Sequence, residues 1–162
     1  MLSEKIQRAL NDQLNAEFYS WYLYLAMAAY FDHLNFNGFA KWMKIQAQEE
    51  MSHAMKIYDY LNVVNAKVTL NNIGSAAKDW VSPLEVFQNV YDHEVEVTNS
   101  INKLVDLAIS EKDHATNNFL IWFVNEQVEE IAIADQILGR LKFIGESHNG
   151  LFFLDHELGK RA

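Results

Sequence analysis

The sequence predicts an all-α fold: a four-helix bundle with one long crossover connection and a short fifth helix at the C-terminus. Three observations favour it. Apolar residues recur at three- and four-residue steps through four long stretches. Six Gly and one Pro in 162 residues leave few positions that break a helix. The aperiodic segment 64–82 is long enough, at roughly 3.3 Å per residue, to cross a whole bundle. We expect one domain over residues 1–162.

The first two predicted helices are joined by a short turn. The first begins at Ser3, which acidic Glu4 follows, and runs to about residue 33. The segment 35–38, with its Asn and Gly residues, interrupts the period, and the second helix covers about 39–62. A turn this short predicts an antiparallel helix hairpin.

The third and fourth predicted helices form a second hairpin. Ser82-Pro83 is a strong helix start, because Ser caps and Pro suits the first turn, and Glu85 stands at the N3 position of a capping box. This helix runs to about residue 110. A polar turn at 111–115 separates it from the fourth helix, over about 116–143.

The last apolar segment, LFFLDHEL at 151–158, could form about three helical turns. It is too apolar for a free short helix, which indicates burial against neighbouring structure. The sequence therefore predicts that copies of the chain associate.

Composition excludes several classes of protein. The formal charge of −9 disfavours nonspecific binding to nucleic acid or to anionic membranes, and it attracts cations. Without Cys, the chain has no disulfide, thiolate metal site or Cys nucleophile. The N-terminus MLSEKIQRAL lacks the pattern of a signal peptide, and no apolar run reaches transmembrane length. We expect a cytoplasmic protein.

Each of the four long stretches carries a carboxylate near its midpoint, inside the apolar stripe: Glu17, Glu50, Glu94 and Glu130. Ionised side chains are rarely buried without a partner, because they lose several kcal/mol or more of solvation. No Lys or Arg lies between positions 8 and 41 or between 112 and 140, so two of the four stretches lack a basic partner over most of their length. A bound metal ion is the predicted cation.

Two pairs of residues with i,i+3 spacing strengthen this interpretation. Glu50-x-x-His53 places a carboxylate and an imidazole on one helix face, and Gln127-x-x-Glu130 occupies the matching position in the fourth helix. The set resembles the ligand scheme of ferritin-like di-iron proteins, in which two helices supply one Glu each and two supply such pairs. Oxygen-rich sites with limited imidazole suit iron and manganese.

Four segments carry a wider resemblance: NAEFYSWYLYLAM, AQEEMSHAMKIYDYL, YDHEVEVT and FLIWFVNEQVEEIAIADQIL. They resemble the bacterial non-haem ferritins over essentially the whole chain. The resemblance implies two sets of iron ligands in a ferroxidase centre, the first being Glu17, Glu50 and His53 and the second Glu50, Glu94 and Glu130, with Gln127 close by. It also matches a third iron site to Glu49, Glu126 and Glu129, for which a solvated acidic strip is the structural alternative.

The resemblance also implies an activity. A ferroxidase of this family oxidises Fe(II) to Fe(III) with dioxygen or peroxide and stores a ferric mineral inside a hollow shell of 24 subunits. Tyr24, two turns after Glu17, would lie beside the centre and donate an electron or a hydrogen bond, and it would also pack in the core. Trp122 has the same two interpretations, of which core packing is favoured.

Met51 raises the question of haem, because bacterioferritins ligate haem through a Met at this position. Those relatives also carry Glu-x-x-His in the last long helix, where this chain has Gln127-x-x-Glu130. The difference favours a labile centre that passes iron onward, and we do not expect haem. The five other histidines lie outside the apolar stripes and are expected at surfaces or contacts: His33, His93, His114, His148 and His156.

Two alternatives from other classes remain. A di-iron oxidase or peroxidase of rubrerythrin type would hold its metals permanently, but the absence of Cys removes the usual rubredoxin module and Gln127 argues against it. A non-catalytic helical interaction protein leaves the carboxylates in the apolar stripes unexplained.

Overall fold

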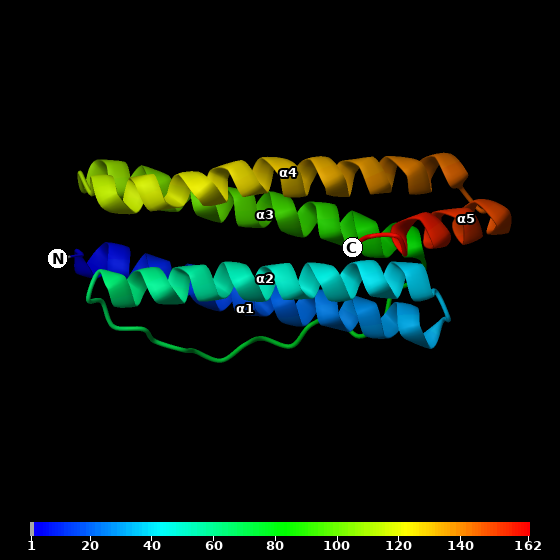
Figure 1. The fold of residues 1–162 in the computed structure, drawn as a ribbon, viewed down its shortest axis with the longest axis horizontal. Coiled ribbons are helices and arrows are strands. Elements are labelled where there is room, and N and C mark those ends of the chain that lie inside the picture. Colours follow the sequence, from blue (N-terminus) through cyan, green and yellow to red (C-terminus); the bar gives the residue numbers. More distant parts are fainter. Residues whose placement is uncertain (1) are drawn as a thin grey trace.

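The computed structural model describes residues 2–162 and confirms the predicted all-α architecture. Helices α1 and α2 form one antiparallel hairpin, α3 and α4 form the other, and the crossover runs along the outside of the first hairpin (Figure 1). Helix α5 lies at the end of the bundle where α1 turns into α2, and it packs on α2 and α4. The bounds are α1 Glu4–His33, α2 Asn37–Val63, α3 Pro83–Ser110, α4 His114–Ile144 and α5 His148–Leu158.

Side-chain caps fix where α1, α3, α4 and α5 begin, whereas α2 begins at Asn37, two residues earlier than predicted, without such a cap. The Ser82 hydroxyl accepts a hydrogen bond from the Glu85 N–H, and the Glu85 carboxylate accepts one from the Val81 N–H, a variant of the expected capping box. Helices α4 and α5 begin two and three residues earlier than predicted. The cause is a cap in each case, since Asp113 accepts from the Thr116 N–H and Ser147 accepts from the Gly150 N–H.

A ladder of side-chain amides ties the crossover to α1. Asn11 accepts from the Thr69 N–H (2.6 Å) and donates to the Lys67 carbonyl (2.9 Å). One turn later Asn15 accepts from the Asn71 N–H (2.9 Å) and donates to the Thr69 carbonyl (3.2 Å). Residues four apart on the helix thus pair with residues two apart on an extended segment, because both spacings cover about 6 Å. The ladder satisfies backbone groups that would otherwise depend on water.

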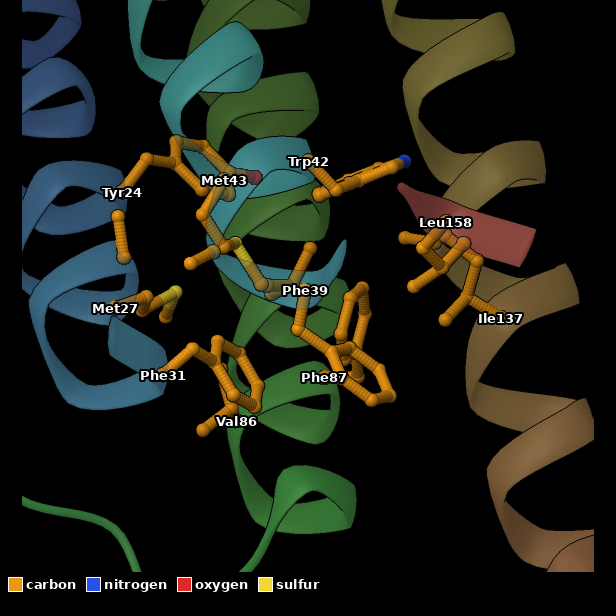
Figure 2. Close-up of a cluster of buried hydrophobic side chains, with 14 of the residues drawn as sticks. Tyr24, Met27, Phe31, Phe39, Trp42, Met43, Val86, Phe87, Ile137 and Leu158 are labelled. Atoms are coloured by element: carbon orange, nitrogen blue, oxygen red, sulfur yellow. The ribbon is translucent and has the colours of Figure 1, made fainter. Parts of the chain in front are cut away.

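The apolar core is divided into two clusters. One lies toward α5 and is rich in aromatic and Met side chains; Figure 2 shows Tyr24, Met27 and Phe31 of α1 facing Phe39 of α2 and Phe87 of α3. The other lies toward the N-terminus of α1 and is mainly aliphatic. Each of the four long helices contributes two to four buried side chains to it. In every long helix, the predicted acidic residue falls between the two clusters. The fold therefore holds a polar layer between two apolar ones.

No helix within residues 2–162 is long and apolar enough to cross a membrane.

Candidate metal centre

The four carboxylates predicted from the apolar stripes are all buried. Their exposed fractions lie between 1% and 5%, and that of His53 is 3%. Each is placed by its own helix at the level between the two core clusters, so the helical period and the antiparallel packing bring them together. The residues are Glu17 from α1, Glu50 and His53 from α2, Glu94 from α3 and Glu130 from α4.

Glu17, Glu50 and His53 form the first compact group. One ligand atom from each lies within 4.8 Å of the other two, which is the separation expected of atoms that share one ion. The His53 Nδ1 is 3.3 Å from the Glu50 carboxylate. The side-chain amide of Gln13 donates to the Glu17 carboxylate (2.7 Å), and the Ser100 hydroxyl donates to the side-chain amide oxygen of Gln13 (2.6 Å). The group is thus oriented by neutral donors from α1 and α3.

A second compact group contains His53, Glu126 and Glu130. The His53 Nε2 is 3.6 Å from the Glu126 carboxylate, so the imidazole stands between the two groups. Glu126 was expected in a separate third site. In this structure it lies next to His53, one turn before Glu130.

Glu94 is held by two uncharged donors. The Tyr24 hydroxyl donates to one carboxylate oxygen, and the Gln127 amide donates to the other at 3.0 Å. Tyr24 is fully buried, and its pKa is raised well above its usual value by burial and by the Glu94 charge, so it remains a donor. The ring of Tyr24 packs in the core while its hydroxyl contacts the Glu94 carboxylate.

Gln46 links two of the carboxylates and was not singled out from the sequence. Its amide nitrogen donates to Glu50 (3.1 Å) and to Glu130 (2.9 Å), which joins α2 to α4 across the centre. The signal was present in the sequence, since Gln46 stands one turn before Glu50 in the same stripe and its side chain is buried.

Three carboxyl groups, those of Glu17, Glu50 and Glu130, have raised pKa values. Burial, then the charge of Glu50, raises the pKa of Glu17 to about 8. Burial and the charge of Glu94 raise the pKa of Glu130 to about 7, and burial followed by the charges of Glu94 and Glu130 raises that of Glu50. These shifts have the expected sign for acids gathered in a low-dielectric layer. A divalent cation would replace those protons.

The three residues expected at a third site do not form one group. Within residues 2–162, the compact acid–histidine groups are the two described above. Glu126 is beside His53, Glu129 is exposed, and Glu49 forms a 2.6 Å ion pair with Arg161.

One expectation about an aromatic group needs correction, whereas the histidines outside the centre lie at surfaces or contacts as expected. The core role favoured for Trp122 is wrong for this chain: Trp122 is 38% exposed, with the Lys56 ammonium 4.3 Å from its ring centre and the His53 ring 5.3 Å away. His93 is a contact residue whose Nε2 lies 2.8 Å from the Ser20 hydroxyl, and burial lowers its pKa. The four remaining histidines outside the centre are exposed: His33, His114, His148 and His156.

An antiparallel bundle with a carboxylate-rich layer, one imidazole and bridging amides defines a class of helical metal-carboxylate proteins. The comparison with known families agrees: residues 7–144 match the ferritin-like domain. The chain belongs to the ferritin-like family.

Named relatives extend over the whole chain. A bacterial non-heme ferritin of Bacteroides fragilis is 46% identical over 161 residues, covering 99% of this chain and 100% of the relative. One from Staphylococcus aureus is 40% identical over 162 residues, covering 100% of this chain and 98% of the relative. The crystal structure of an open pore ferritin from the archaeon Archaeoglobus fulgidus superimposes with a TM-score of 0.99 at 50% identity, with 100% of both chains covered.

Proposed function

We propose that this protein stores iron and oxidises Fe(II) to Fe(III) at the buried centre. One observation carries the proposal: Glu17, Glu50 and His53 converge within ligand distance in a layer where burial and mutual repulsion disfavour charge. Cation binding relieves that repulsion. The family relationship and the non-heme ferritins among the relatives support iron as the cation.

In the proposed reaction, two Fe(II) ions are the substrate and bind side by side. Glu17, Glu50 and His53 would hold one ion. Glu50, Glu94 and Glu130 would hold the other, with Glu50 shared between them and Gln127 nearby. To bind, Glu50 and Glu130 lose protons and exchange their hydrogen bonds from Gln46 for bonds to the metal.

The electron balance needs two iron ions for each two-electron oxidant. Two Fe(II) give one electron each to dioxygen, which takes up two protons to become hydrogen peroxide; with peroxide as oxidant the same electrons and two protons give two waters. The carboxylates neutralise the added ferric charge, and Tyr24 remains in place as a hydrogen-bond donor to Glu94. A donor set with one imidazole holds Fe(III) less firmly than a histidine-rich set, so the product can leave. Glu49, Glu126 and Glu129 would receive it.

Storage of a mineral needs a container larger than one bundle. Large apolar side chains are exposed at the α4–α5 end, notably Phe143 (94%), Phe152 (77%) and Phe153 (65%). Exposed apolar area of this kind marks contacts between molecules. We propose a homo-oligomeric shell, with 24 subunits as the number implied by the family, located in the cytoplasm.

Stopped-flow absorbance after mixing metal-free protein with Fe(II) and oxygen tests the centre. Glu50→Ala with His53→Ala should abolish rapid oxidation. A matched control is available, because Glu111-x-x-His114 has the same residue types and spacing and both residues are exposed, Glu111 in the α3–α4 turn and His114 at the start of α4. Glu111→Ala with His114→Ala should oxidise iron at the unaltered rate. Equal rates for the two double variants would refute the assignment.

Iron content after aerobic loading separates the remaining alternatives. A store elutes from a size-exclusion column as an oligomer with many iron atoms per chain. A permanent di-iron enzyme would carry about two, and an interaction protein would carry none.

A further inference from the structure

Arg161, which follows α5, reaches the polar layer from outside the bundle. Its Nη2 donates to the Glu49 carboxylate at 2.6 Å, and its Nη1 donates to the side-chain amide oxygen of Gln46 at 2.9 Å. The guanidinium also lies over the Trp42 ring, 4.6 Å from its centre. All three partners are on α2, one to eight residues before Glu50. The side chain of Arg161 is 20% exposed, so the contact is partly withdrawn from water.

The position of Arg161 is set by close packing of α5 on α2. A Cβ on Gly38 would lie 1.6 Å from the Asp155 carbonyl oxygen, so only glycine allows this approach. The Asp155 carboxylate accepts from the Phe39 N–H (2.9 Å), and Lys41 donates to the Gly159 carbonyl (3.0 Å). The backbone just before Arg161 is therefore held against α2.

The contact with Gln46 has a directional consequence. A guanidinium can only donate hydrogen bonds, so the amide oxygen of Gln46 must face Arg161. The amide nitrogen then faces Glu50 and Glu130, where its two hydrogens are used. Arg161 thereby keeps the Gln46 oxygen away from the centre.

The contact with Glu49 has an electrostatic consequence. Glu49 belongs to the proposed third site together with Glu126 and Glu129, yet its carboxylate is turned to Arg161 and takes no part in the compact groups. A cation entering that site meets one carboxylate already neutralised and a positive charge nearby. Both effects weaken its binding.

We propose that Arg161 is a positioning residue that holds Glu49 as a counter-ion, so that a divalent cation fills the third site only by displacing it. The proposal rests on the proposed function, because it concerns the site that receives iron after the di-iron pair. Arg161 then keeps the third site weaker than the pair, which favours filling the pair first.

Titration of the metal-free, full-length protein with Zn(II), followed by isothermal titration calorimetry, tests this without redox chemistry. Arg161→Gln should bind a third Zn(II) per chain about three- to fivefold more tightly than the unaltered protein, the upper part of the range expected when a partly exposed ion pair is removed. Its first two Zn(II) should bind within about twofold of the unaltered affinity. Arg161→Lys keeps the charge and should restore the weak third site. Deletion of residues 161–162 should reproduce the Gln variant, which guards against a folding defect specific to one substitution.

Two control variants test whether the change in the third Zn(II) affinity is specific to Arg161 and Glu49. Lys160→Gln removes a charge from the adjacent residue, whose ammonium pairs with Glu157 instead, and it should leave all Zn(II) affinities unchanged. Adding Glu49→Gln to Arg161→Gln should abolish the gain. An unchanged third affinity in both Arg161→Gln and the deletion, or an equal gain in Lys160→Gln, would overturn the proposal. Failure of the proposed function looks different, because the unaltered protein would then lack two tight Zn(II) sites.

Discussion

Glu17→Gln should stabilise the metal-free protein, and more so at higher pH. Burial and the charge of Glu50 raise the pKa of Glu17 from 4.5 to about 8, so its ionised form is disfavoured in the folded state. Glutamine has nearly the same shape and keeps an oxygen that can accept the hydrogen bond from Gln13. The substitution therefore removes the charge while preserving the packing.

The sign follows from proton linkage. A folded-state pKa above the unfolded value means that the folded state binds the proton more tightly, so this contribution to stability is complete below about pH 4.5 and is lost as pH rises through about 8. At 1.36 kcal/mol per pKa unit, the shift sets an upper limit of roughly 5 kcal/mol. Local relaxation and water entry reduce this, and we expect a gain of about 2–3 kcal/mol at pH 8, or about 5–10 °C in Tm. At pH 5 the gain should be small.

Differential scanning calorimetry of metal-free protein at pH 5 and pH 8 measures the effect. Glu146→Gln removes an exposed carboxylate from the α4–α5 turn and serves as the control, with little change in Tm expected at either pH. A Glu17→Gln gain that is absent at pH 8, or equal at the two pH values, would refute the argument that this buried charge opposes folding. The same variant should lose most of the Tm increase that Zn(II) gives the unaltered protein.

Three further substitutions test other parts of the molecule. Tyr24→Phe leaves one Glu94 oxygen without its donor, and the metal-free protein should lose about 1.5–3 kcal/mol by calorimetry at neutral pH, with Zn(II) restoring part of it. Asn11→Ala removes two bonds to the crossover, so limited proteolysis should cut within residues 64–82 faster than in the unaltered protein, at an unchanged rate elsewhere. Gly38→Ala forces a Cβ against the Asp155 backbone and should displace α5, which size-exclusion chromatography would report as loss of the oligomer.

The helices could be predicted from the sequence because their apolar stripes are long and regular. The errors lie mainly at helix starts. Asp113 belongs to a polar segment that was interpreted as a turn, and Ser147 precedes the predicted fifth helix, whereas each accepts a hydrogen bond from an N–H three residues later and so begins a helix. The ladder between Asn11 and the crossover was not predicted, because a polar amide side chain on an amphipathic helix gives no signal about a distant extended segment.

The centre was partly predictable for a different reason. An ionised residue inside an apolar stripe conflicts with burial, and that conflict identified Glu17, Glu50, Glu94 and Glu130. Neutral amides produce no comparable conflict, so Gln13 and Gln46 passed unnoticed although they are buried beside the carboxylates.

Arg161 could not have been predicted at all. It lies far from Glu49 in the sequence and outside any helix, and only the docking of α5 brings the two together. The proposed third site depends on the same tertiary detail, since Glu126 turns to His53 while Glu49 turns to Arg161.

The hydrogen-bonding groups of the centre are satisfied without a metal ion, but the charges of its carboxylates are not balanced. Within residues 2–162, every buried side-chain nitrogen or oxygen has a hydrogen-bond partner, and around the carboxylates the donors are largely neutral groups such as Gln13, Gln46 and Tyr24. These groups hold the ligand geometry without a cation. They do not offset the burial and the mutual charge that raise the pKa values of Glu17 and Glu130. A cation is therefore needed to balance charge and not to build the site. We therefore expect such a site to fill and empty without unfolding, as the proposed passage of iron from the centre to a store requires.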